Sequence, residues 1–325
     1  MAKGPQKLKA LYLAKVLLTE TDEKHPLMMG EIIEKLSAYG IEAERKGLYA
    51  DIEELRTFGL DIVGERQGRY FAYYIGSRQF ELPELKLLTD SVLASKFISE
   101  KKSKELVKKL EGLASREEAR ELNREIVISG RVKTVNEGVY YTVDSIHEAM
   151  AAGKKIRFRY FQWNVRKEKE LRHEGAFYVV SPWALLWDDE YYYLIAYDGM
   201  IKHYRVDKML LLTVTEEDRE GRESFEKLDM GSYSKKTFSM FSGNEETVTI
   251  EAENRFAGII IDRFGHDVFI MPVDKEHFRV HVTVAVSEQF ISWIFSLGEG
   301  IRITGPDSVT KRVRETVERL SRQYL

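Results

Sequence analysis

The spacing of apolar residues changes along this chain, and that change limits the possible folds more than any other feature. Up to about residue 125 most apolar residues recur at helical spacing, whereas from about residue 126 most alternate with polar residues, as in β-strands. A chain of 325 residues is also too long for one ordinary domain. The sequence therefore predicts a multi-domain α+β protein with a helical N-terminal part and a strand-rich remainder.

The N-terminal part contains three short helical patterns followed by a hairpin pattern. The third helical pattern puts Leu48, Ile52 and Leu55 on one face and ends at Gly59, a residue suited to the left-handed position after a helix. The hairpin pattern that follows has a turn at residues 67–68. Three helices and a two-stranded wing, in this order, predict a winged helix-turn-helix.

In a winged helix-turn-helix the third helix enters the major groove of DNA. Lysine and arginine would neutralise phosphates, and Tyr49 could touch a base or a sugar. The predicted DNA-binding residues lie on the exposed face of the third helix and in the wing: Arg45, Lys46, Tyr49, Arg56, Arg66, Gln67 and Arg69. The alternative is a plain interaction domain, since residues 1–80 hold 12 Lys/Arg and 12 Asp/Glu and so carry no net charge.

The rest of the chain divides into three further segments. Residues 81–125 predict a helical connector, because apolar residues recur there at helical spacing among many charges. Residues 126–240 contain short strand patterns separated by turns, which predict a small β-barrel. Residues 241–325 mix strand and helix patterns and predict a compact α+β unit, in which Asp307 caps the last helix.

The stretch "YYYLIAYDGMIKHYRVDKMLLL", residues 191–212, crowds aromatic rings and positive charges into one predicted hairpin. Arginine binds phosphate or carboxylate through two hydrogen bonds, lysine supplies a point charge, and tyrosine rings stack on bases. The predicted ligand-binding residues come from this hairpin and an earlier strand: Tyr160, Tyr193, Lys202, His203 and Arg205. The sequence thus predicts a pocket for a planar anion.

A purely structural role for this hairpin stays open. Side chains alternate along a strand, so Lys202 and Arg205 point to opposite faces unless the strand bulges or twists. Arg205 could also pair with Asp207 or Asp198 and serve only to stabilise the hairpin.

Composition excludes several other functions. The chain has no cysteine, so it forms no disulfide, zinc–thiolate site or cysteine nucleophile. Its net charge of −3 shows that it does not bind nucleic acid through an overall positive charge.

No apolar run approaches the roughly 18 residues that span a bilayer, so we expect a cytoplasmic protein that does not contact membranes. His277 and His281 lie in a stretch that alternates like a strand. On a strand their imidazoles would be roughly 13 Å apart, which is too far to share a metal ion. We expect no cofactor and no catalytic residues.

At residues 181–209 the sequence resembles the WYL-domain transcriptional regulators of bacteria. Pro182 matches the family's proline, and Tyr192-Tyr193-Leu194 stands at its Trp-Tyr-Leu, so the first position departs. "IRFRY" at 156–160 is similar to the family's opening strand, and Lys202, Arg205 and Lys208 stand where its basic residues recur. "ERKGLYADIEELRTFGLDI" resembles the family's DeoR-like winged helix, with departures at Gly47 and Ala50. The final segment, with Trp293 and "GIRITGP", resembles the family's C-terminal extension.

The resemblance implies a bacterial transcription factor whose winged helix (residues 1–80) binds double-stranded DNA. It implies that residues 126–240 form an Sm- or SH3-like WYL barrel that senses a nucleotide or single-stranded nucleic acid. Residues 241–325 would then support a homodimer or close the pocket. One alternative is an accessory protein that binds RNA or single strands through the barrel, which the neutral N-terminal domain and Ala50 favour. A nucleotide-acting enzyme is a further alternative, with His203 as its one candidate base.

Overall fold

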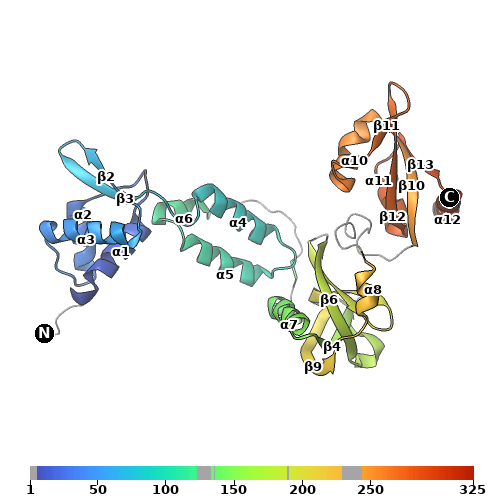
Figure 1. Cartoon of the computed structure of the whole chain (residues 1–325), viewed down its shortest axis with the longest axis horizontal. Coiled ribbons are helices and arrows are strands. Elements are labelled where there is room, and N and C mark those ends of the chain that lie inside the picture. Colours follow the sequence, from blue (N-terminus) through green and yellow to red (C-terminus); the bar gives the residue numbers. More distant parts are fainter. Residues whose placement is uncertain (1–5, 123–132, 135, 189, 229–243) are drawn as a thin grey trace. The chain divides into compact units, whose positions relative to one another are not determined.

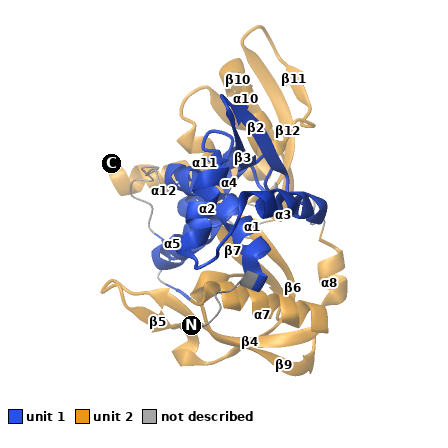
Figure 2. Cartoon of the chain, turned by 90° about the vertical axis from the view of Figure 1, so that its left-hand side faces the viewer, with its two compact units in different colours: residues 1–137 blue, residues 138–325 orange. Residues whose placement is uncertain are grey.

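A computed structural model describes residues 6–122, 133–134, 136–188, 190–228 and 244–325. The chain forms two compact units, Met1–Glu137 and Gly138–Leu325, coloured separately in Figure 2. Helices and antiparallel sheets occur in both units (Figure 1), which confirms the predicted multi-domain α+β organisation. The predicted switch near residue 126 lies outside the described residues. Among the described helices, none is long and apolar enough to cross a bilayer.

The first unit begins with three helices and a small sheet. The sheet is antiparallel in the order β1-β3-β2, and the helices pack through Leu13, Ile32, Leu48 and their neighbours. Gly59 ends the third helix in the left-handed region at φ 112°, as the sequence predicts. The elements are η1 (Gln6–Leu8), α1 (Lys9–Glu20), β1 (Leu27–Met28), α2 (Met29–Ala38), α3 (Arg45–Phe58), β2 (Ile62–Gln67) and β3 (Tyr70–Ile75).

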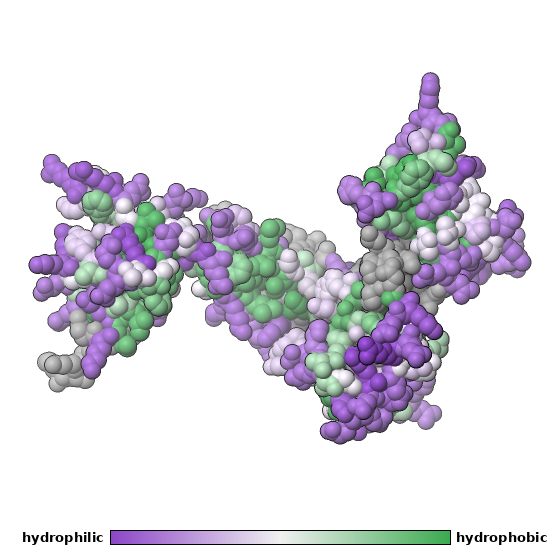
Figure 3. Space-filling view, in the orientation of Figure 1, coloured by the Kyte–Doolittle hydropathy of each residue, from purple (hydrophilic) through white to green (hydrophobic). Residues whose placement is uncertain are grey.

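Three connector helices complete this unit: α4 (Leu82–Ala94), α5 (Glu100–Glu111) and α6 (Arg116–Leu122). The start of α6 is tied to the loop after α1, because Ser115 Oγ donates to Asp22 Oδ2 over 2.5 Å. Arg78 strengthens this junction by donating to the carbonyl oxygens of Leu18 and Thr21 at the end of α1. Apolar side chains are exposed on the visible face of α4 and α5 (Figure 3).

The second unit starts with α7 and a six-stranded antiparallel sheet. β4 is its central strand and pairs with β5, β6 and β9, while β7 and β8 follow β6. The rings of Phe158, Tyr160, Tyr178 and Tyr204 pack against one another inside the sheet. The elements are α7 (Val139–Ala152), β4 (Lys154–Trp163), β5 (Lys169–Leu171), η2 (Arg172–Gly175), β6 (Tyr178–Asp188), β7 (Tyr191–Tyr197), β8 (Ile201–Arg205), η3 (Val206–Lys208), β9 (Met209–Asp218) and α8 (Arg222–Glu226).

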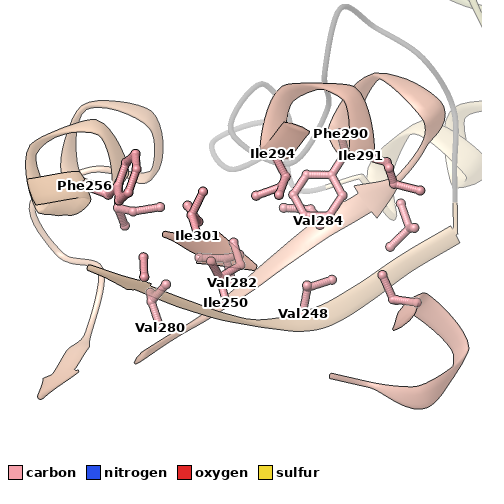
Figure 4. Close-up of a cluster of buried hydrophobic side chains, with 14 of the residues drawn as sticks. Val248, Ile250, Phe256, Val280, Val282, Val284, Phe290, Ile291, Ile294 and Ile301 are labelled. Atoms are coloured by element: carbon pink, nitrogen blue, oxygen red, sulfur yellow. The ribbon is translucent and has the colours of Figure 1, made fainter. Parts of the chain in front are cut away.

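The C-terminal part is a four-stranded antiparallel sheet, in the order β11-β12-β10-β13, with helices packed on it. In Figure 4, Phe290, Ile291 and Ile294 lie over the apolar side chains of the sheet. The elements are β10 (Asn244–Glu253), η4 (Asn254–Phe256), α10 (Ala257–Phe264), β11 (Ile270–Pro272), β12 (His277–Val286), α11 (Glu288–Ser296), β13 (Ile301–Gly305) and α12 (Asp307–Tyr324).

The predicted cap of the last helix is wrong. Pro306 is the N-cap, and Asp307 is already the first residue of α12. No side-chain capping hydrogen bond forms there. The extended backbone of the preceding strand leads into the helix one residue earlier than the aspartate alone suggested.

Candidate functional site

Tyr160 lies on the central strand β4 of the six-stranded sheet and positions the end of β8. Its side chain is 8% exposed, and its hydroxyl oxygen accepts a hydrogen bond from the backbone N–H of Arg205 over 3.0 Å. Burial raises the pKa of Tyr160 to about 12, so its hydroxyl stays protonated at neutral pH. Tyr160 is therefore placed to support Arg205, with little surface of its own for a ligand.

Arg205 makes a two-pronged ion pair with Asp207. Its Nε lies 3.1 Å from Oδ1 and its Nη2 lies 2.9 Å from Oδ2. The guanidinium carbon also sits 3.6 Å from the ring centroid of Tyr191. Burial alone lowers the pKa of Arg205, but the hydrogen bonds and charge of Asp207, with Tyr191, raise it overall. The arginine is thus held rigidly in its charged form.

Two further cations influence this pair electrostatically. Burial lowers the pKa of Lys208, and the neighbouring charges of Arg205 and Arg172 lower it further, while Asp207 opposes them. Asp207 is 9% exposed and already engaged by Arg205. Asp207 is the ion-pair partner of Arg205, and Lys208 lies close enough to feel the charges of Arg205 and Arg172, an arrangement suited to an anionic ligand. We call Arg172, Arg205 and Lys208, with Asp207 and Tyr191, the cation cluster.

The structure does not bring Lys202 to Arg205. β8 pairs with β7 in continuous register, so these two side chains stay on opposite faces, as the alternation indicated. Lys202 instead forms an ion pair with Asp198, with 2.6 Å between Nζ and Oδ2. The sequence leaves open whether both cations share one pocket, and this geometry keeps them apart.

Two other predicted ligand-binding residues are largely enclosed. Tyr193 is 9% exposed and lies opposite Arg205 in the sheet register. His203 is half-buried, and burial lowers its pKa, which favours the neutral imidazole at neutral pH. Both lie on the same side of the sheet as Arg205, but neither offers much surface to a ligand.

The sequence-based set of ligand-binding residues lacks Tyr191, Lys208 and Arg172, although Lys208 is one of the basic residues that recur in the hairpin. Tyr191 lies two residues before Tyr193 on one strand, so strand alternation could have identified it. Arg172 could not have been found in this way, because it begins a turn in which His173 and Glu174 both have positive φ, 50° and 55°. Sequence pattern does not reveal such a turn, since neither residue is glycine.

Among the predicted DNA-binding residues, Arg45, Lys46 and Tyr49 lie together on the exposed face of α3. The Tyr49 residue is 46% exposed. Arg56 is different, because its Nε donates to the Ile62 carbonyl oxygen over 2.7 Å and its Nη1 to Glu53 over 2.6 Å. Arg56 thus joins the end of α3 to β2.

The remaining predicted DNA-binding residues lie at the tip of the β2–β3 hairpin. Arg66, Gln67 and Arg69 are all exposed, and Arg66 Nε donates to the Gly68 carbonyl oxygen over 3.1 Å. Gly68 has a positive φ of 64°, which allows the tight turn between the strands. The hairpin therefore presents two arginines and an amide at its end.

Two protein-family models match the chain. The WYL domain matches residues 141–214, and the WCX domain matches residues 244–321. The chain therefore contains both domains, each within the segment where the sequence predicted the barrel or the C-terminal extension. All members of the cation cluster lie inside the WYL match.

Among solved structures, the chain is similar to the proteasome accessory factor B/C (PafBC) of Arthrobacter aurescens. The sequence identity is 18%, the match covers 99% of this chain and 49% of that chain, and the TM-score is 0.28. This chain thus spans about half the length of that protein, and no structural conclusion follows at such a score. A search of curated proteins finds no match.

Proposed function

We propose that this protein is a ligand-responsive, DNA-binding transcriptional regulator. Residues 1–80 act as a winged helix-turn-helix on operator DNA, and the segment 126–240 is an Sm- or SH3-like barrel that senses an anionic ligand. The observation that carries the proposal is a WYL domain that holds the Arg205–Asp207 ion pair, in one chain with exposed Arg45 and Lys46 at the start of α3.

The α3 face supplies the chemistry that DNA contact requires. Arg45 and Lys46 open the helix and are exposed, which suits ion pairs with phosphates. Tyr49 follows one turn later and can reach a sugar or a base edge. Arg66 and Arg69 at the hairpin tip would act as the wing and contact the neighbouring backbone. Arg56 contributes to this surface mainly by fixing β2 to α3.

The cation cluster supplies the chemistry for an effector that carries phosphate. Lys208 and Arg172 add positive charge beside the Arg205–Asp207 pair, and the Tyr191 ring, though it lies against the Arg205 guanidinium, is partly exposed. A nucleotide or a single-stranded nucleic acid would satisfy both features. Coupling to DNA affinity needs only about 1–3 kcal/mol.

A homodimer would present two winged helices to half-sites spaced by about one helical turn, ~34 Å, or a multiple. Residues 241–325 would hold the two copies together or close over the ligand. Sedimentation velocity of the purified protein tests this directly, and a monomer at all micromolar concentrations would contradict it.

Fluorescence anisotropy with the duplex upstream of the protein's own gene tests DNA binding. We expect tighter binding than to a shuffled duplex of equal composition. The double variant Arg45→Ala/Lys46→Ala should weaken binding and reduce the slope of log K against log salt by about 2. Lys104→Ala, an exposed lysine of α5, is the matched control. Equal affinity for both duplexes would count against operator recognition.

A second titration separates the regulator from its main rival. Single-stranded oligonucleotides and nucleoside phosphates are added to the protein–duplex complex, and we expect one of them to change duplex affinity in wild type but not in Arg205→Ala. If single strands bind through Arg205 and no duplex binds at all, the barrel is the working site and the protein is a single-strand-binding accessory factor. Turnover of a bound nucleotide would point instead to an enzyme.

A further inference from the structure

The outer face of β4 carries two arginines that do not belong to the cation cluster. Ile156, Phe158 and Tyr160 point into the buried interior of the sheet. Arg157 and Arg159 alternate with them and therefore lie on the opposite, outer face. Among the described residues, neither Arg157 nor Arg159 forms a hydrogen bond, ion pair or ring contact with a member of the cation cluster. The two arginines thus form a separate surface.

Apolar side chains surround both arginines. The guanidinium carbons of Arg157 and Arg159 lie over the ring of Phe177, 5.3 and 4.9 Å from its centroid. In the sheet register Val179 is the neighbour of Arg157, and Leu210 is the neighbour of Arg159. Phe177 is 41% exposed and Val179 is 42% exposed. We call this surface, formed by Arg157, Arg159, Phe177, Val179, Leu210 and Thr213, the arginine patch.

The polar groups of the patch are incompletely used within the chain. Arg157 Nε donates to Thr213 Oγ1 over 2.9 Å. The Nε of Arg159 is buried and has no hydrogen-bond partner. In the part of the chain that the structure describes, neither arginine forms an ion pair with a carboxylate, although most nearby cations, such as Lys154 and Lys155, do so. Two guanidinium groups therefore remain available for an anion from another molecule.

We propose that the arginine patch binds an acidic segment of a partner protein in an extended conformation. Arg157 and Arg159 are two residues apart on a strand, so their separation of about 7 Å matches carboxylates at alternate positions of another extended chain. A guanidinium fork binds a carboxylate through two parallel hydrogen bonds. Aliphatic residues between the acidic ones would cover Val179 and Leu210.

Charge alone would also permit a nucleic acid, but the apolar part of the patch favours a peptide. Single strands bind by stacking bases on free aromatic faces. The one ring in the patch, Phe177, already has two guanidinium groups over it. The other apolar members of the patch, Val179 and Leu210, are aliphatic. They would pack better against valine or leucine side chains of a peptide than against the bases of a nucleic acid.

Fluorescence anisotropy on the full-length protein tests the proposal with a labelled dodecapeptide in which glutamate alternates with valine and serine. We expect saturable binding that is at least about tenfold weaker in Arg157→Ala/Arg159→Ala. The matched control is Arg166→Ala/Lys227→Ala, which removes two exposed cations outside the patch. A peptide with lysine in place of glutamate should not bind.

The variant Arg157→Lys/Arg159→Lys keeps both charges and the fold but loses the planar fork, so we expect an intermediate affinity. Circular dichroism melting confirms folding of each variant. Absence of peptide binding to the wild type, equal loss in the control variant, or full affinity in the lysine variant would each overturn the proposal. Binding of labelled oligo(dT) that is lost with both arginines, without peptide binding, would assign the patch to nucleic acid instead.

Discussion

The hydroxyl oxygen of Tyr160 lies 3.0 Å from the backbone nitrogen of Arg205 and accepts its hydrogen bond. These residues are 45 positions apart, and this contact joins the central strand β4 to the last residue of β8. Arg205 begins the short turn that carries Asp207 and Lys208. The position of the cation cluster thus depends on a phenol that is itself buried.

Replacing Tyr160 with phenylalanine should therefore destabilise the second unit. The ring still packs with Phe158 and Tyr204, but the Arg205 N–H loses its acceptor in a buried place. We expect a loss of about 1–3 kcal/mol in the free energy of unfolding, measured by urea titration with fluorescence detection. Tyr141→Phe, at a 64% exposed position of α7, is the matched control and should change little.

The junction between Asp22 and Ser115 should weaken in acid. Burial by itself raises the pKa of Asp22. The interactions that lower it, led by the hydrogen bonds from Ser115 and His25, together outweigh burial, so the pKa of Asp22 lies below its ordinary value. A carboxyl group with a lowered pKa in the folded state stabilises the fold above its unfolded pKa, about 3.9. That contribution is lost as the pH falls through the lower, folded-state pKa.

This pH dependence can be measured against Asp22→Asn. The difference in unfolding free energy between wild type and Asp22→Asn should be largest near neutral pH and shrink below about pH 4. Ser115→Ala removes one of the hydrogen bonds that lower this pKa, so its loss of stability should begin at a higher pH. A difference that stays constant between pH 7 and pH 3 would contradict the assignment to Asp22.

Lys133, which follows α6 in the chain, should stabilise the packing of α4 and α5 more than the lysines within those helices do. Its Nζ donates to the carbonyl oxygens of Val92 and Ser95, and to Ser103 Oγ over 2.8 Å. Lys133→Met should cost about 1–3 kcal/mol, because these acceptors lose a charged donor in a partly buried place. Lys104→Met breaks only the exposed pair with Glu100 and should cost less than about 0.5 kcal/mol in the same urea titration.

Arg56 should affect stability, and Arg45 should affect DNA binding. Arg56→Ala removes the bond to the Ile62 carbonyl oxygen and should lower the unfolding free energy by about 1–2 kcal/mol. Arg45→Ala, at the exposed start of α3, should leave the melting temperature unchanged and weaken duplex binding. If Arg56→Ala weakens DNA binding without loss of stability, Arg56 contacts the phosphates as the helix pattern first predicted.

The sequence by itself determined the elements and much of their order. The helical spacing of apolar residues and the glycine that follows them predicted α3 correctly, with Leu48, Ile52 and Leu55 buried and Gly59 at its end. Both features are local properties of the chain, which is why the sequence reveals them. Strand alternation also indicated correctly that Lys202 and Arg205 lie on opposite faces.

Tertiary structure alone decided which side chains meet. Arg172 joins the cation cluster through a turn with two non-glycine residues at positive φ, and Arg157 and Arg159 meet Phe177 only because β6 pairs beside β4. Such contacts join residues that are distant in sequence or set by strand register, and the local spacing of residue types does not encode them.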